Sequence, residues 1–140
     1  MDMPRILIVE DDPLTTLALR EIANYAGFEV VGTAATVIGA IDIAQWGEPD
    51  IAVIDVQLAG RRDGIAGALL LRREFGTQII FLSAMADAAT RARAAAAHPA
   101  AFLAKPCSAQ ALLAAIGAAL VQRAASPVRR SLPGSERQML

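Results

Sequence analysis

Several residue types are scarce in this chain of 140 residues, and each scarcity excludes a class of protein. A single cysteine, Cys107, rules out an internal disulfide framework and is typical of a reducing compartment. Acidic and basic side chains nearly cancel to a net charge of −1, so no strong overall field attracts nucleic acid or an anionic membrane. The longest clean apolar run, residues 111–121, is well short of the roughly 20 residues that a membrane helix needs. The sequence therefore predicts a cytoplasmic protein without a membrane segment.

Hydrophobic residues are concentrated instead in short runs. Five of these runs have the length of strands and are rich in Ile, Val, Leu, Phe or Ala: 5–9, 28–33, 51–55, 78–82 and 100–104. They are apolar throughout rather than alternating, a pattern typical of parallel strands that are buried on both faces.

Segments with helical spacing separate the apolar runs. The first carries a stripe that we expect to face the core, and it ends at Gly27; its members are Leu14, Leu17, Ala18, Ile22 and Tyr25. Further helices are expected from about residues 37, 65, 87 and 108 onward. This alternation predicts an α/β fold with a doubly wound, five-stranded parallel sheet. Because no glycine fingerprint follows the first strand, the flavodoxin-like order 2-1-3-4-5 is expected rather than the Rossmann order.

The last 15 residues differ in composition from the rest of the chain. Residues 126–140 hold two prolines, a glycine and three serines, and they have little apolar content. We therefore expect one domain over residues 1–125 and a flexible tail over residues 126–140, with no second domain.

Carboxylates follow two of the expected strands, where the crevice of a 2-1-3-4-5 sheet opens. Glu10, Asp11 and Asp12 come directly after the first strand, and Asp55 ends the third. Carboxylates held a few ångströms apart repel one another and are best tolerated around a hard cation such as Mg²⁺. The alternative is solvated loop acids or helix caps, and we favour the cap for Asp12 because it precedes Pro13 and a helix.

Two more polar residues stand at the ends of the fourth and fifth strands. Ser83 places a hydroxyl there, although an ordinary loop serine is an equally good interpretation. Lys105 is the only lysine of the chain, beside twelve arginines, and it precedes Pro106. A lysine is a compact charge that reaches a single phosphate or carboxylate oxygen, and a surface lysine is the less favoured alternative. A cis bond before Pro106 would help to aim its ammonium group into the crevice.

Three other conspicuous residues have simpler interpretations. We expect Trp46 to pack at the end of a helix and His98 to lie at the end of another. Cys107 is expected to be a packed small hydrophobe, because no base that would activate its thiol is evident.

Taken together, four blocks resemble the signature of response-regulator receiver domains of two-component signalling. The blocks are ILIVEDD, IAVIDVQL, IIFLSA and FLAKP, they occur in order, and the resemblance covers roughly residues 5–121. The resemblance implies a stand-alone receiver, because no DNA-binding effector follows it in this sequence.

The resemblance also assigns roles to individual residues. Asp55 would be the phosphoacceptor, and Glu10 and Asp11 would form the acidic pair that binds Mg²⁺ together with Asp55. The backbone carbonyl of Gln57 would be a further metal ligand. Ser83 would bond the phosphoryl group, Lys105 would be the catalytic lysine, and Phe102 would be the aromatic switch residue.

The chain departs from the family at the loop after the third strand. Ala59 stands where the family usually has proline, and the stretch 58–64 is basic and about one residue longer than usual. The conformation of this loop is therefore left open.

The resemblance implies a phosphoacceptor switch rather than an enzyme, with self-catalysed phosphotransfer and dephosphorylation only. Its expected partners are a sensor histidine kinase or a histidine phosphotransfer protein, and a downstream protein target. Helices 4 and 5 are rich in alanine, so helix 4, strand 5 and helix 5 are expected to bind that target or to pair two copies of the chain. Small alanine side chains that simply pack tightly on the sheet are an equally good interpretation.

Two rival functions come from other classes. A degenerate receiver would act as an interaction or dimerisation module that never takes phosphate, but the full residue set argues against it. A phosphohydrolase of the haloacid-dehalogenase type would need a second aspartate two residues after Asp55, where this chain has Gln57.

Overall fold

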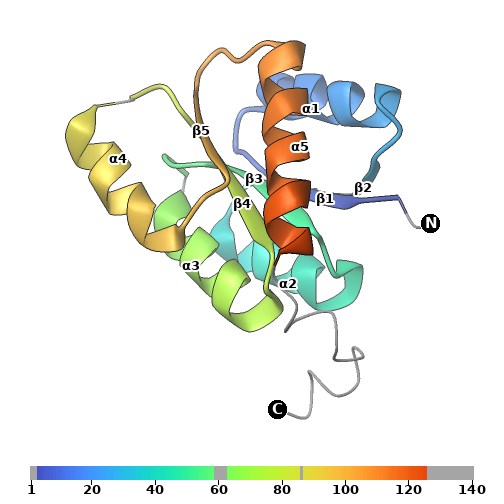
Figure 1. Cartoon of the computed structure of the whole chain (residues 1–140), viewed down its shortest axis with the longest axis horizontal. Coiled ribbons are helices and arrows are strands. Elements are labelled where there is room, and N and C mark those ends of the chain that lie inside the picture. Colours follow the sequence, from blue (N-terminus) through green and yellow to red (C-terminus); the bar gives the residue numbers. More distant parts are fainter. Residues whose placement is uncertain (1–2, 59–62, 86, 126–140) are drawn as a thin grey trace.

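The computed structural model describes residues 3–58, 63–85 and 87–125. The predicted tail, residues 126–140, lies outside the described residues, and so do residues 59–62 of the unusual loop. Within the described residues, five parallel strands form a single sheet in the order β2-β1-β3-β4-β5 (Figure 1). The α/β doubly wound fold and its strand order are thus confirmed.

The elements alternate along the chain as the sequence predicts. The strands are β1 (Arg5–Val9), β2 (Glu29–Ala34), β3 (Ile51–Asp55), β4 (Gln78–Ser83) and β5 (Ala101–Ala104). The helices are α1 (Pro13–Tyr25), α2 (Val37–Gly47), α3 (Gly64–Phe75), α4 (Ala88–Ala94) and α5 (Ala109–Ala124). The fourth helix is short, and a 3-10 turn over Ala95–Ala97 follows it directly.

Helices cover both faces of the sheet and enclose two hydrophobic layers. Figure 1 shows α1 and α5 on one face, and α2, α3 and α4 on the other. Successive strand residues point to opposite faces, so Ile8 and Val53 pack toward α1 and α5 while Leu7 and Ile54 pack toward α2 and α3. The central strands β1, β3 and β4 are almost wholly buried, as their apolar sequences predict. The edge strands β2 and β5 stay half-exposed, since each has only one neighbouring strand.

A side-chain cap fixes the start of each α-helix. In every case, a side-chain oxygen accepts a hydrogen bond from the backbone amide three residues later; the caps are Asp12, Thr36, Asp63, Asp87 and Ser108. Such a cap typically contributes about 1 kcal/mol. The expectation that Asp12 is a helix cap is confirmed.

Two sequence-based expectations about packing are wrong. The stripe expected to bury α1 includes Leu14 and Tyr25, which are 77% and 96% exposed, whereas Leu19 and Ala23 face the core. The helix has apolar residues on two sides, and periodicity alone did not show which side meets the sheet. Trp46, expected to pack at the end of α2, is instead 78% exposed.

Among the described residues, no helix is both long enough and apolar enough to cross a membrane.

Candidate functional site

Asp55 ends the fully buried strand β3, and its carboxylate is held at the carboxyl edge of the sheet. Only 4% of the residue is exposed. One carboxylate oxygen, Oδ1, accepts a hydrogen bond from the backbone amide of Gln57 at 3.0 Å. The other, Oδ2, lies 2.8 Å from Nζ of Lys105. Because β3 lies between β1 and β4, residues that follow both neighbouring strands can reach this carboxylate.

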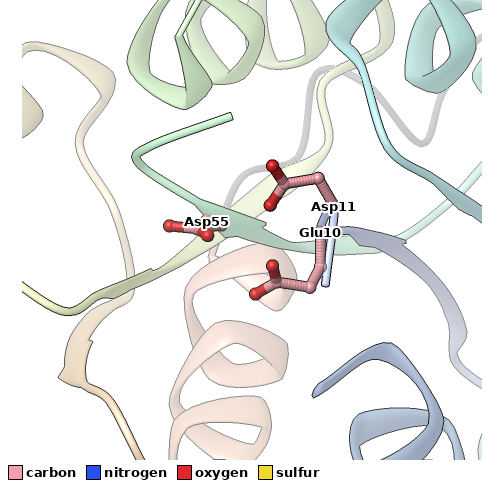
Figure 2. Close-up of side chains that lie close together, drawn as sticks. All are labelled: Glu10, Asp11 and Asp55. Atoms are coloured by element: carbon pink, nitrogen blue, oxygen red, sulfur yellow. The ribbon is translucent and has the colours of Figure 1, made fainter. Parts of the chain in front are cut away.

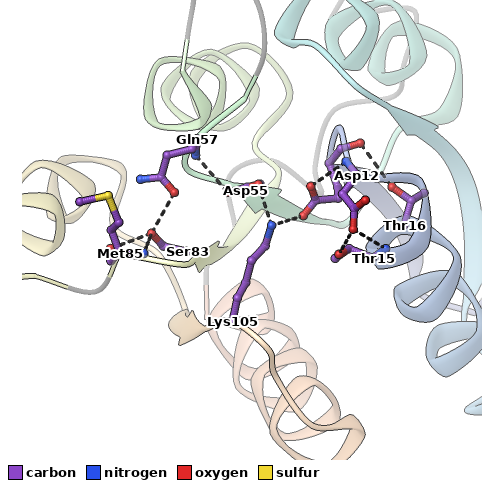
Figure 3. Close-up of polar contacts among 9 residues, drawn as sticks. Asp12, Thr15, Thr16, Asp55, Gln57, Ser83, Met85 and Lys105 are labelled. Atoms are coloured by element: carbon purple, nitrogen blue, oxygen red, sulfur yellow. Dashed lines mark hydrogen bonds and ion pairs between the residues drawn. The ribbon is translucent and has the colours of Figure 1, made fainter.

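Lys105 brings its ammonium group between two carboxylates. It follows the edge strand β5, its own amide donates to the carbonyl of Ser83, and its peptide bond to Pro106 is cis. Nζ lies 2.6 Å from Oε1 of Glu10 and 2.8 Å from Oδ2 of Asp55. A dashed line in Figure 3 marks the contact between Lys105 and Asp55. Burial lowers the pKa of Lys105, but the hydrogen bonds to Asp55 and Glu10 outweigh it and raise that pKa above its ordinary value. The only lysine of the chain is thus held in its charged form at this site.

Glu10 and Asp11 complete a cluster of three carboxylates. Burial raises the pKa of Glu10, and the hydrogen bond from Lys105 opposes that rise. Asp11 is exposed, and one oxygen from each of Glu10, Asp11 and Asp55 lies within 4.8 Å of the others (Figure 2). Three carboxylates around one ammonium leave two negative charges, which a divalent cation would balance. The all-oxygen donor set therefore fits Mg²⁺.

Asp12 lies beside this cluster but has a different role. Its Oδ2 accepts hydrogen bonds from the amide of Thr15 at 3.1 Å and from the Thr15 hydroxyl at 2.6 Å. These bonds hold the pKa of Asp12 below its usual value. The side chain caps α1 and does not join the three carboxylates.

Ser83 ends β4 on the other side of Asp55, and its hydroxyl is engaged in local hydrogen bonds. Ser83 Oγ lies 2.7 Å from the carbonyl oxygen of Met85 and 3.2 Å from Oε1 of Gln57, and it accepts from the Met85 amide at 3.0 Å (Figure 3). The hydroxyl has one proton to donate, so the two acceptors compete for it. Sequence reasoning identified Ser83 and Gln57 but missed Met85. The available signal was the tendency of a serine hydroxyl to bond the backbone two residues later.

Gly64 is a second residue that sequence reasoning missed. It begins α3, and its amide donates to the carbonyl of Val56 at 2.8 Å. A Cβ atom at this position would lie 2.0 Å from the backbone oxygen of Asp55. Only glycine lets α3 start this close to the end of β3, so Gly64 supports the backbone that carries Asp55.

Phe102 connects the sheet to α4. Its ring lies 6.1 Å from that of Phe81, centroid to centroid, and the guanidinium of Arg91 stands 4.6 Å above its centroid. Phe102 is therefore half-buried beneath α4, beside the strand that ends in Ser83.

An apolar cavity of ≈ 460 Å³ opens between α1 and the residues that follow β5. Lys105 and Cys107 line it together with Leu14 and Ala18. Burial raises the pKa of the Cys107 thiol, which suits its expected role as a packed residue.

Comparison with known families settles the class of this fold and site. The family model described as the response regulator receiver domain matches residues 6–117, which include every residue of the site. The chain belongs to the response regulator receiver domain family. Receiver domains of this family are phosphoacceptor switches rather than enzymes in the usual sense, and they typically bind Mg²⁺ at an acidic cluster.

Two of the curated relatives of this receiver are named as regulators. The transcriptional regulatory protein PdtaR of Mycobacterium tuberculosis is 37% identical over 114 residues, which cover 80% of this chain and 54% of PdtaR. The phyllosphere-induced regulator PhyR of Methylorubrum extorquens is 34% identical over 80 residues, covering 56% of this chain and 30% of PhyR. The chain thus spans about half the length of PdtaR, and less of PhyR.

Solved receiver structures share the fold. The signal receiver domain of a modulated diguanylate cyclase from Desulfovibrio desulfuricans G20 superposes with a TM-score of 0.84 at 34% identity. That match covers 89% of this chain and 99% of the other.

Proposed function

We propose that this receiver accepts a phosphoryl group on Asp55 from a phosphohistidine of a sensor kinase or a phosphotransfer protein. The observation that carries the proposal is the position of the Asp55 carboxylate, buried at the edge of the sheet between Lys105 and the acidic pair. In the transfer, a carboxylate oxygen of Asp55 attacks phosphorus and the bond from phosphorus to the histidine nitrogen breaks. The nitrogen keeps the bonding electrons, and the product is an acyl phosphate.

The pocket residues would neutralise charge during this transfer. Glu10, Asp11, Asp55 and the carbonyl of Gln57 would hold Mg²⁺, which supplies positive charge to the phosphoryl oxygens when it is bound. The ammonium of Lys105 already lies at the attacking carboxylate, so it can pass from that oxygen to an oxygen of the incoming group.

Ser83 and Phe102 would convert the new charge into a change of surface. The Ser83 hydroxyl would exchange its bonds to Met85 and Gln57 for a bond to the acyl phosphate, drawing the start of the β4–α4 connection inward. Phe102 would then rotate into the space that this movement leaves. The result is a shift between two packings of α4, β5 and α5, the face that would bind a downstream protein or a second copy. Attack of water on the acyl phosphate would reset the switch.

Phosphorylation with a small phosphodonor tests the assignment of Asp55. The wild-type protein incubated with acetyl phosphate and Mg²⁺ should gain the mass of one phosphoryl group, whereas Asp55→Asn should gain none. Glu21→Gln is a matched control, because it removes an exposed carboxylate of α1 that takes no part in the site. Equal labelling of the wild type and Asp55→Asn would refute the assignment. If neither protein is labelled, by acetyl phosphate or by a panel of kinases, the result would favour the interaction module instead.

A further inference from the structure

A second pocket lies at the opposite end of the sheet from Asp55. Its volume is ≈ 450 Å³, and it is formed where β1 and β2 begin and α2 ends. Its lining includes Arg5, Glu29, Asp42 and Trp46, with Val31 and Ile43 at its apolar wall. None of these residues takes part in the proposed phosphotransfer.

Trp46 is the feature of this pocket that fold stability does not explain. It is the single tryptophan of the chain, and 78% of it is exposed. Ile38, two turns earlier on the same side of α2, is 81% exposed. A tryptophan that is not needed in the core but borders a pocket is typical of a protein-binding surface, where tryptophan is over-represented.

Charge indicates what the pocket would accept. Asp42 lies one helical turn before Trp46, and Glu29 lines the same pocket. Neither carboxylate has a side-chain partner among the residues that the structure describes. Arg5 supplies one positive charge, so the lining keeps one more negative charge than positive. An anion would meet two carboxylates that outnumber the single Arg5, whereas a cation would be attracted by those carboxylates and would lie beside the indole of Trp46.

We propose that this pocket, bounded by Trp46, Asp42 and Glu29, binds an arginine side chain of a partner protein. A guanidinium is planar, stacks on an indole face and pairs with a carboxylate at the same time, which a lysine ammonium does less well. Its aliphatic stem would lie along the wall formed by Val31 and Ile43. Strand addition to the edge of β2 is the less favoured mode, because the β1–β2 register shifts between Ile6 and Leu7 and bulges blunt an edge strand.

The location of this pocket, at the far end of the sheet from Asp55, makes its binding of a partner independent of phosphorylation. Arg5 and Glu29 begin their strands, whereas Glu10 and Asp55 follow or end theirs. The pocket would therefore tether the receiver to its partner in both phosphorylation states, while the switch face changes with phosphate.

The indole signal of Trp46 gives a direct test, because a ¹H–¹⁵N spectrum of this chain contains one tryptophan side-chain peak. The probe is the capped peptide acetyl-Leu-Arg-Leu-amide, and its control contains citrulline, which keeps the shape of arginine but not its charge. We expect the arginine peptide to shift the indole peak and the amides of α2 and β2 saturably. The citrulline peptide should bind about fivefold more weakly, as expected for loss of a cation–π contact and an exposed ion pair.

Two variants with the same change of net charge locate the binding. Asp42→Asn should weaken binding of the arginine peptide severalfold. Glu21→Gln, on the exposed side of α1, should leave that binding unchanged. Asp55→Asn should bind like the wild type, so failure of the phosphotransfer proposal leaves this one intact. Equal binding of the two peptides, equal weakening by the two charge variants, or no shift at millimolar peptide would overturn it. A concentration-dependent indole shift without peptide, with a dimer in sedimentation, would replace the partner with a second copy of this chain.

Discussion

At the scale of single residues, the site depends on one position that takes no part in the chemistry. Gly64 lets the start of α3 approach the backbone of Asp55, and the hydrogen bond from its amide to Val56 closes the connection after β3. Because backbone atoms cannot move aside as a flexible side chain can, the position tolerates no Cβ atom without displacing α3 or β3.

We therefore expect Gly64→Ala to lower the free energy of unfolding by roughly 1–3 kcal/mol, the usual effect of overpacking. It should also slow phosphorylation of Asp55, because the carboxylate moves with its backbone. Gly117→Ala is the matched control. Gly117 lies in α5 with open space around its missing side chain, so alanine there should stabilise the helix by about 0.5–1 kcal/mol. Urea denaturation of the wild type, Gly64→Ala and Gly117→Ala measures both changes in the free energy of unfolding. A Gly64→Ala protein as stable as the wild type would contradict the close approach.

Single residues also mark where sequence reasoning succeeds. Asp55 and Lys105 could be predicted because a charged residue at the carboxyl end of an apolar strand must emerge at the edge of the sheet. The double ion pair of Lys105, with Glu10 as well as Asp55, could not be predicted, because it depends on side-chain distances across three strands.

At the scale of elements, α4 has little apolar packing to hold it. It is a seven-residue helix rich in alanine, and only Thr90 and Ala94 of it are buried. Two arginines compensate: Arg91 covers the ring of Phe102, and Arg93 pairs with Asp63, the cap of α3. Both contacts join α4 to residues that belong to, or border, the proposed switch.

The ion pair between Asp63 and Arg93 makes a contribution to the free energy of unfolding that depends on pH. Partial burial of Asp63 opposes its ionisation, but hydrogen bonds from the Ala66 amide and from Arg93 hold its pKa below the ordinary value. A carboxyl group with a lowered folded-state pKa adds stability above its unfolded-state pKa, near 4, and loses it as the pH falls through the folded-state value.

Asp63→Asn separates the charge from the cap, because asparagine also caps helices. We expect it to cost about 0.5 kcal/mol or less at pH 7, since the pair is partly solvated, and the difference from wild type should vanish as the pH falls below about 4. Asp63→Ala should cost about 1 kcal/mol more, because the cap is lost as well. Denaturation across this pH range measures the effect. A difference between Asp63→Asn and wild type that stays constant down to the lowest pH would exclude an ionic origin.

Elements also show why parts of the fold could not be predicted. The strand order follows from the alternation of apolar runs and helical spacing, and β1, β3 and β4 are buried as that pattern indicates. The buried side of α1 could not be chosen, because Leu14 and Leu17 are as apolar as Leu19, and only the sheet decides which faces inward. The exposure of Trp46 was missed for a related reason. Sequence shows that a tryptophan is apolar, but it does not show whether the neighbouring elements leave room to bury it.

At the scale of the whole molecule, the receiver places two surfaces with different chemistry at opposite ends of one parallel sheet. The carboxylates and Lys105 gather where the strands end, and the Trp46 pocket lies where β1 and β2 begin. A switch at one end and a constant contact at the other would let a partner stay bound while phosphate alters the α4–β5–α5 face.

Metal binding should connect the acidic end to the stability of the whole fold. If Mg²⁺ binds the folded chain through Asp11 and Asp55, mass action adds about 2.7 kcal/mol at a hundredfold excess over the dissociation constant. The thermal midpoint should therefore rise with Mg²⁺, and chelation should return it to its starting value. Asp11→Asn should abolish the rise while leaving the metal-free protein at least as stable as the wild type, since it removes one of three neighbouring negative charges. Glu21→Gln makes the same change of charge on α1 and should keep the full rise. A midpoint that stays unchanged at saturating Mg²⁺, or one that rises equally in Asp11→Asn, would show that these carboxylates do not form the metal site.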